Sequence, residues 1–237
     1  MDYENRLLIV SSMFNVESWI ERSISSVLAQ NYNNFKYIMV DDCSTDRTVE
    51  IVKSLISEND KVVLRENTEK KFSLRSIYDG INALEPKDDD IILTLDGDDW
   101  FAHNNVLSVI NDKYNKSDCW MTYGSYVEFP TGNRGIEASK YPISDIKENN
   151  FRKSKWRASH LRTFRYKLWK KIKEDDFLDW NGEFFRTSID KVFMFPMLEM
   201  SGEKSHYVDD VLYVYNLGNP LNIHKVRRQL QFKSSHY

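Results

Sequence analysis

The first half of the sequence alternates short apolar runs with segments whose apolar residues recur at helical spacing. The apolar runs are RLLIV (6–10), FKYIMV (35–40), KVVLRE (61–66) and DIILTL (90–95). Helical spacing is found at about 16–28, 51–56, 73–84 and 106–114. Strands that are apolar throughout, each followed by a helix, are typical of a parallel sheet covered on both faces. The predicted fold class is therefore α/β.

Size and composition limit the alternatives. The chain has 237 residues, of which 41% are hydrophobic, and this predicts one large domain over 1–237 with a sizeable core. The net charge of −3 excludes the global positive field that would favour nucleic acid as a partner. Only two cysteines, Cys43 and Cys119, indicate a reducing compartment without a disulfide framework. No apolar run is long enough for a membrane span or a signal peptide, so we expect a cytoplasmic protein.

The C-terminal segment HKVRRQLQFKSSHY (224–237) combines basic and apolar residues. Such a segment could make peripheral contact with an anionic membrane surface. A solvated terminal helix is the favoured interpretation.

The alternation ends near residue 118. CWMTYGSYVEF (119–129) and YVDDVLYVYN (207–216) are expected to be strands, whereas HLRTFRYKLWKKI (160–172) and SIDKVFMFPMLEMSG (188–202) are expected to contain helices. Pro196 should kink or end a turn of the second helical segment. The single domain is thus predicted to have a regular half, 1–117, and a mixed half, 118–237.

Polar side chains follow three of the predicted strands, at the point where each strand ends. These are Ser11, Ser12 and Asn15 after the first, Asp41 and Asp42 after the second, and Asp96, Asp98 and Asp99 after the fourth. Ligands of open α/β sheets bind beyond the carboxyl ends of the strands. The sequence therefore predicts a single pocket at this edge.

The stretch LDGDD (95–99) raises the possibility of a metal site. Clustered carboxylates raise one another's pKa unless a cation neutralises them, and Mg²⁺ and Mn²⁺ prefer such hard oxygen ligands. On an extended backbone, Asp96 and Asp98 would point to the same side, and Gly97 would permit a tight turn between them. Taken alone, DGDD also fits a surface turn.

Asp42 offers a second anchor. A carboxylate at a strand end can accept hydrogen bonds from the imide N–H of a pyrimidine or from ribose hydroxyls. The alternative for Asp42 is a helix N-cap.

The stretch from IVSSMFNVESWI to VDDCSTDRT (9–48), followed by LDGDDW (95–100), resembles glycosyltransferase family 2. The resemblance covers about residues 6–115, and it implies the GT-A nucleotide-sugar fold with a mixed acceptor-side part. It further implies that Asp42 contacts the base, that Ser12 and Asn15 lie along the nucleoside, and that Arg75 and Lys71 lie near the base or phosphates. Asp96 and Asp98 would bind ribose and a bridging Mn²⁺ or Mg²⁺, with Asp99 as a substitute ligand.

The second half carries the resemblance at fewer positions. Family members have a catalytic Asp at the start of a helix, and here Asp190 matches, although Ile189 precedes it where the family often has Glu. Some relatives supply a His to the metal after the last strand, which makes His224 a candidate, with a packed or surface histidine as the alternative. The stretch ASHLRTF (158–164) resembles an acceptor-side segment, which makes His160 and Arg162 candidates for acceptor contacts.

The resemblance implies a metal-dependent inverting glycosyltransferase. Its donor would be a nucleoside-diphosphate sugar, with UDP as the expected nucleotide, and its acceptor a glycan or lipid-linked sugar. One alternative is a phosphatase of the haloacid dehalogenase type, in which a Thr or Val is required where this chain has Trp100. Another is a non-catalytic module that only binds a nucleotide-sugar or glycan.

Overall fold

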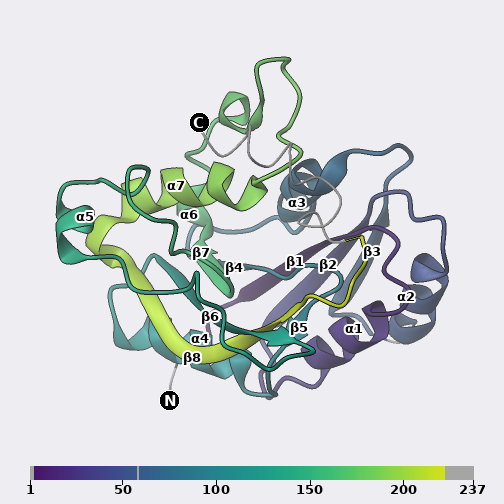
Figure 1. The fold of residues 1–237 in the computed structure, drawn as a ribbon. Helices are drawn as coiled ribbons and strands as arrows, with labels where there is room; N and C mark the ends of the chain where they lie inside the picture. The colour runs from purple at the N-terminus through teal and green to yellow at the C-terminus, as the bar shows by residue number, and fades with distance from the viewer. Residues whose placement is uncertain (1–2, 58, 222–237) are drawn as a thin grey trace.

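A computed structural model describes residues 3–57 and 59–221 (Figure 1). One eight-stranded sheet, in the order β3-β2-β1-β4-β7-β6-β8-β5, runs through both halves of the chain. The strands are β1 (Leu7–Met13), β2 (Phe35–Asp41), β3 (Val62–Glu66), β4 (Ile91–Thr94), β5 (Trp100–Phe101), β6 (Met121–Phe129), β7 (Arg162–Arg165) and β8 (Ser205–Asn216). The predicted α/β class with a mostly parallel first half is confirmed.

The parallel part of the sheet consists of β3, β2, β1 and β4. Within it, Val10 lies opposite Ile38 of β2 and Thr94 of β4, so the carboxyl ends of the three strands meet at one edge. Beyond β4 the sheet becomes mixed, because β7 is antiparallel to both β4 and β6, whereas β8 runs parallel to β6. Because β7 is antiparallel to β4, the first residue of β7, Arg162, lies opposite Thr94 at the carboxyl end of β4. The second half of the chain therefore reaches the edge at which β1, β2 and β4 end.

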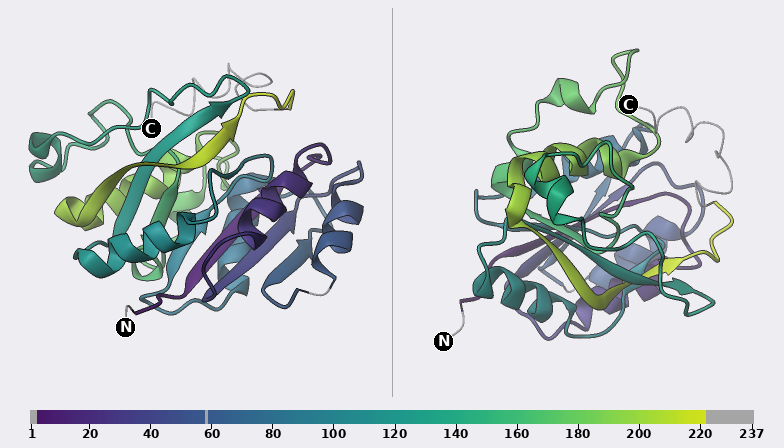
Figure 2. Two further views of the ribbon diagram at one scale, coloured as in Figure 1. Left: turned by 90° about the horizontal axis from the view of Figure 1, so that it is seen from below. Right: turned by 60° about the vertical axis from the view of Figure 1, so that its left-hand side comes forward.

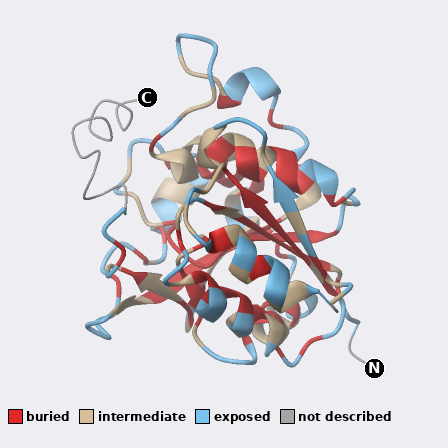
Figure 3. Cartoon of the chain, turned by 90° about the vertical axis from the view of Figure 1, so that its right-hand side faces the viewer, coloured by how far each residue is buried: buried red, intermediate tan, exposed pale blue. Residues whose placement is uncertain are grey.

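Helices cover both faces of the sheet (Figure 1, Figure 2). One core cluster contains residues of α1 (Ile20–Leu28), α2 (Thr48–Ile56) and α4 (Val106–Lys116), and the other contains residues of α3 (Phe72–Ala83), α6 (Tyr166–Trp169) and α7 (Ile189–Ser201). The remaining helical segments are α5 (Ile143–Lys147), η1 (Glu174–Phe177) and η2 (Gly202–Lys204). Alternate residues of β1 face opposite clusters: Leu7 and Ile9 pack in the first, Leu8 and Val10 in the second. Figure 3 shows most of the sheet as buried and the outer helix faces as exposed, while the edge strand β3 also carries exposed residues.

The structure corrects one element of the second half. The segment HLRTFRYKLWKKI, expected to contain a helix, does contain the short helix Tyr166–Trp169, but strand β7 precedes that helix and was not expected. Thr163 and Phe164 of β7 are buried between β4 and β6, and a buried strand of this length is too short to show a periodicity of its own. Pro196 lies inside α7, which continues to Ser201, so the helix is not ended there.

Within the described residues, no helix is both long and apolar enough to cross a lipid bilayer. The basic C-terminal segment lies beyond the described residues, so peripheral membrane contact stays a prediction.

Candidate active site

A cavity of about 900 Å³ opens at the carboxyl ends of β1, β2 and β4. Its other wall comes from β7, from the start of α7 and from the segment after β6. Residues predicted from sequence that line it are Ser12, Asp42, Asp96, Asp98, His160, Arg162 and Asp190. Polar groups separated by as many as 178 positions therefore face one space, as the strand-end pattern predicted for the first half.

The DGDD stretch forms the tight turn that Gly97 was expected to permit, and its backbone is not extended. The Asp99 N–H donates to the Asp96 carbonyl at 3.0 Å, with Gly97 and Asp98 at the corner. A Cβ on Gly97 would lie 2.7 Å from the Cβ of Met13, so glycine is required for close approach to β1. The turn directs Asp96 and Asp98 into the cavity.

Asp99 lies behind this turn, and it is fully buried. Its carboxylate accepts hydrogen bonds from the Tyr213 hydroxyl at 2.6 Å and from the Asn216 N–H at 2.7 Å. Burial, together with the charges of Asp98 and Asp96, raises the pKa of Asp99 well above its usual range. Asp99 thus connects the turn to β8, and it is not among the residues that line the cavity, which disfavours the predicted role as substitute ligand.

The segment that follows β8 supports Asp98 directly. Asn219 donates from Nδ2 to the Asp98 carboxylate at 2.7 Å, and Asn216 donates to the Asp98 carbonyl at 3.1 Å. Burial raises the pKa of Asp98, and the hydrogen bond from Asn219 opposes this effect. Sequence analysis missed both asparagines, although NLGN (216–219) precedes the segment from which His224 was proposed. His224 itself lies outside the described residues.

Asp96 carries a strongly shifted pKa. The pKa of its carboxyl is raised to about 6, chiefly by burial; Arg162 opposes this rise, and the charges of Asp98 and Asp190 add to it. A divalent cation would relieve this repulsion, and carboxylate oxygens are the ligands that Mg²⁺ and Mn²⁺ prefer. The donor set of Asp96 and Asp98 therefore fits such a cation.

A different trio of ligand atoms, from Asp96, Asp99 and His160, also lies within 4.8 Å of one another. Two contacts disfavour it. The Asp99 oxygens already accept hydrogen bonds from Tyr213 and from the backbone of β8. The Nε2 atom of His160 lies 3.2 Å from the Arg162 guanidinium, which can only donate, so this nitrogen is an acceptor that is already in use.

Asp42 is almost fully buried, with an exposure of 2%. Its carboxylate accepts hydrogen bonds from the backbone N–H groups of Lys71 and Phe72, at 2.7 and 2.9 Å, where α3 begins. It also lies 3.5 Å from the Lys70 ammonium. Asp42 therefore caps a helix, though of α3 and not of the helix that follows it in sequence, while it still lines the cavity.

Three predicted nucleotide contacts are not among the described residues that line the cavity. Lys71 and Arg75 both form ion pairs with Asp79, at 3.2 and 2.8 Å. Asn15 holds the loop after β2, because its side-chain oxygen accepts the Thr45 N–H at 2.7 Å. The cavity instead receives Lys70, which sequence analysis missed, and its ammonium lies over the Phe14 ring.

Asp190 lies in the first turn of α7, where the helix dipole favours a negative charge. Its carboxylate is 3.3 Å from the Arg162 guanidinium, which in turn lies beside His160. The His160 ring stacks on Tyr213 and Tyr215, with centroids 4.4 and 5.3 Å apart. Arg162 thus contacts the predicted base directly, and His160 contacts Arg162.

Comparisons with known proteins agree on one family. The family profile described as "Glycosyl transferase family 2" matches residues 8–193. An uncharacterized glycosyltransferase of Haemophilus influenzae is 30% identical over 120 residues, which are 50% of this chain and 46% of that protein. The GalNAc(5)-diNAcBac-PP-undecaprenol beta-1,3-glucosyltransferase of Campylobacter jejuni is 22% identical and covers 90% of this chain and 65% of its own length. The chain spans less than half of the Haemophilus influenzae relative.

Solved structures share the fold at low sequence identity. S. aureus TarS 1-349 in complex with UDP-GlcNAc has a TM-score of 0.67 at 14% identity, covering 90% of this chain and 59% of that one. The mannosyltransferase PcManGT of Pyrobaculum calidifontis, in complex with GDP-Man and Mn2+, has a TM-score of 0.59 at 17% identity, covering 90% and 57%. The mixed sheet with helices on both faces is therefore an arrangement that proteins binding nucleotide-sugars also have.

Proposed function

The chain belongs to glycosyl transferase family 2, and on that premise we propose that it is a metal-dependent, inverting glycosyltransferase. The donor is a nucleoside-diphosphate sugar, with UDP as the expected nucleotide, and the acceptor is a hydroxyl of a glycan or lipid-linked sugar. One observation carries the proposal: the carboxylates of Asp96, Asp98 and Asp190 face the same cavity, two at the end of β4 and one at the start of α7.

The first half of the chain would bind the donor. Ser12 and Asp42 line the cavity at the ends of β1 and β2, where the nucleoside would lie, and Lys70 is placed to meet its negative charge. Lys71, Arg75 and Asn15 would act indirectly, by fixing the start of α3 and the loop after β2. Two of the named neighbours bind UDP-GlcNAc and GDP-Man, which supports a nucleotide-sugar donor without deciding the base.

Asp96 and Asp98 would hold the divalent cation, Mn²⁺ or Mg²⁺. The chemistry that the bound cation supplies is neutralisation of the charge that develops on the departing nucleoside diphosphate. Asn219 orients the Asp98 carboxylate for this role, and β8 fixes the turn through Asp99.

Asp190 would act as the general base. Its carboxylate accepts the proton of the acceptor hydroxyl as that oxygen bonds to the anomeric carbon, while the bond from this carbon to the diphosphate oxygen breaks. Attack from the face opposite the leaving group inverts the configuration. Arg162, at 3.3 Å, keeps the carboxylate oriented.

The family match leaves the haloacid dehalogenase alternative without support. The other alternative is a non-catalytic module that binds a nucleotide-sugar or glycan. Such a module would show no turnover of the donor. Release of the nucleoside diphosphate from a donor sugar, measured with and without acceptor, distinguishes the two.

The donor assignment is tested by thermal unfolding with UDP, GDP, dTDP and CDP sugars, each with and without Mn²⁺. A ligand that binds only the native state at a hundredfold excess over its dissociation constant stabilises it by about 2.7 kcal/mol. We expect a metal-dependent rise in melting temperature with UDP sugars above all. A flat response to every nucleotide in the presence of Mn²⁺ would refute the proposed donor class.

A further inference from the structure

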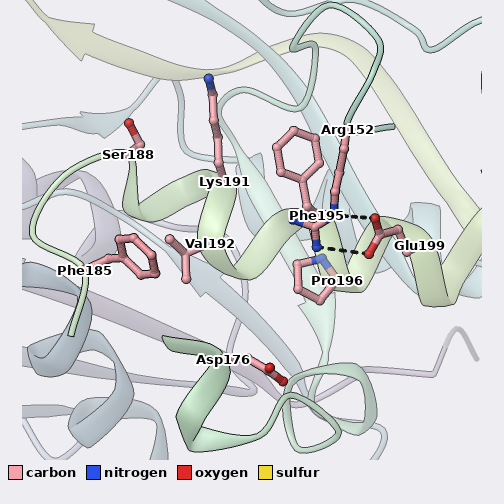
Figure 4. Close-up of a pocket in the computed structure, with 9 residues that line it drawn as sticks. All are labelled: Arg152, Asp176, Phe185, Ser188, Lys191, Val192, Phe195, Pro196 and Glu199. Carbon is pink, nitrogen blue, oxygen red and sulfur yellow. Dashed lines mark hydrogen bonds and ion pairs between the residues drawn. The ribbon is translucent and has the colours of Figure 1, made fainter. Parts of the chain in front are cut away.

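A second cavity, of about 380 Å³, lies against α7 next to the main one (Figure 4). Its walls come from α7, from η1 and the segment between the two, and from Arg152. Ser188 and Lys191 line both cavities, and they flank the proposed base, Asp190. The two cavities therefore adjoin at the start of α7, and a molecule with a hydroxyl at Asp190 would enter the second cavity by passing Ser188 and Lys191.

We propose that the second cavity binds a neutral sugar residue of an oligosaccharide acceptor, namely the residue next to the one that is glycosylated. The inference rests on the proposed function, because Asp190 defines where the acceptor hydroxyl lies. It adds the substrate class: an acceptor of at least two sugar residues.

The polar groups of the second cavity suit a neutral, hydroxyl-rich ligand. Arg152 and Glu199 form a two-pronged ion pair, with Nε and Nη2 at 2.6 and 3.1 Å from the two carboxylate oxygens (Figure 4). The pair still has guanidinium N–H donors and carboxylate lone pairs for further hydrogen bonds. Sugar hydroxyls both donate and accept, so they can bond to both partners. Because the pair is neutral overall, it gives no preference for a phosphate.

The backbone of α7 adds another acceptor. Pro196 has no N–H, so the carbonyl of Val192, four residues earlier, lacks the donor that an α-helix normally supplies. Both residues line the cavity, and Figure 4 draws their side chains on the same side of α7. A carbonyl freed in this way is an additional hydrogen-bond acceptor for a hydroxyl group of the ligand.

Two aromatic rings, Phe185 and Phe195, line the second cavity, and Figure 4 draws them well apart along α7. The Arg152 guanidinium lies 5.3 Å from the ring centre of Phe195. Phe195 also packs edge to face on Trp156, with centroids 5.2 Å apart, and Trp156 lines the main cavity. Aromatic rings beside hydrogen-bonding groups match the alternating apolar and polar faces of a sugar ring.

The test measures saccharide binding by NMR titration in the presence of UDP and Mn²⁺. The ligands are methyl glycosides of glucose, galactose, GlcNAc and GalNAc, and the disaccharides that join these sugars through β-1,3 or β-1,4 bonds. We expect one or more disaccharides to bind the unmodified protein at least tenfold more tightly than either of the corresponding methyl glycosides. Equal binding of disaccharides and monosaccharides throughout would overturn the proposal.

Two variants test whether the second cavity causes the preference for disaccharides. Phe185→Ala and the isosteric Glu199→Gln should each weaken disaccharide binding about tenfold and leave monosaccharide binding unchanged. Lys53→Gln is the matched control, because it breaks an ion pair with Glu66 on the surface of α2 and β3. Melting curves check the fold, and Glu199→Gln keeps the test valid if Phe185→Ala is unstable. Equal weakening of both ligand classes would also overturn the proposal.

Asp190→Asn separates this inference from the proposed function. The variant should lose transfer and retain the preference for disaccharides. If no nucleotide-sugar is turned over by the unmodified protein while the Phe185-dependent preference persists, the proposed function fails and the saccharide site stands. If transfer is normal but the preference for disaccharides is absent, the proposed function stands and the saccharide site is refuted.

Discussion

The two halves of the molecule reach the same cavity in different ways. In the first half, β1, β2 and β4 are neighbours in a parallel sheet, and each delivers its polar residues at its own carboxyl end. In the second half, β7 is antiparallel to both β4 and β6, whereas β8 is parallel to β6 and antiparallel to β5. The proposed donor side is thus built from parallel strands whose carboxyl ends share one edge, whereas the proposed acceptor side depends on mixed pairing. We therefore expect substitutions on the two sides to affect different steps of the proposed reaction.

The largest expected effect concerns the acceptor half. Asp190→Asn removes the proposed base without changing side-chain size, so the transfer rate should fall by about 10²–10⁴-fold. The thermal shift caused by UDP and Mn²⁺ should remain, because the donor groups are on the other side of the cavity. Asp175→Asn, at an exposed position of η1, is the control. Retention of full transfer would exclude Asp190 as the base.

The corresponding change in the donor half is Asp98→Ala. Losing a metal ligand should lower Mn²⁺-dependent turnover by more than about 100-fold, since even outer contacts of a metal site are worth 10–100-fold. The stabilisation by Mn²⁺ plus UDP should disappear together with turnover. Asp112→Ala, on the surface of α4, controls for the loss of a carboxylate. Unchanged metal dependence in Asp98→Ala would contradict the metal site.

The segment after β8 joins the two halves, and Asn219→Ala tests that connection. Without the 2.7 Å hydrogen bond to Asp98, Mn²⁺ affinity should fall by about 10-fold. Titration with Mn²⁺ at fixed UDP measures the change, and the exposed Asn33→Ala should leave affinity as it was. An unaltered titration curve for Asn219→Ala would show that the second half does not contribute to the metal site through this contact.

Sequence patterns predicted the strands of the first half well because β1, β2 and β4 are buried on both faces. A strand such as β1, whose residues are almost all buried, must be apolar throughout, and its end is marked by the first polar residues. Strand β8 was also predicted, at 207–216, but buried and exposed positions are mixed along it, so its sequence does not indicate that it pairs with β6 and β5. The cap that Asp42 places on α3 was out of reach, because it depends on how the chain folds back in three dimensions. The ion pair of Arg75 with Asp79, in contrast, joins residues four positions apart within the helix expected at 73–84, so the sequence carried a signal for it.

The pH dependence of Mn²⁺ binding and of stability provides a smaller test of the proposed donor side. In the metal-free protein, burial raises the pKa of Asp96 to about 6. The ionised form binds the cation, so Mn²⁺ affinity should be full above this pKa and fall about 10-fold as the pH is lowered from 7 to 5. The stability of the metal-free protein depends on pH with the opposite sign, because the folded state binds the Asp96 proton more tightly than the unfolded state does. Its contribution to the free energy of unfolding therefore decreases as the pH rises from about 4 to 6.

Calorimetric titration of Mn²⁺ at several pH values, with UDP present, measures the first effect. Thermal unfolding of the metal-free protein measures the second. An affinity that stays constant from pH 7 to 5 would mean that no carboxyl with a raised pKa binds the cation.

The smallest effect distinguishes two basic residues that flank the start of α3. Lys70 lines the cavity beside Asp42, whereas Arg75 is held by Asp79, 2.8 Å away. Lys70→Gln should therefore raise the donor KM several-fold, and Arg75→Gln should change it by less than about twofold, with kcat similar in both. Each substitution removes one positive charge near the same helix, so the two variants control for each other. A larger effect from Arg75→Gln would mean that Arg75 leaves Asp79 when the donor binds, as the family resemblance implies.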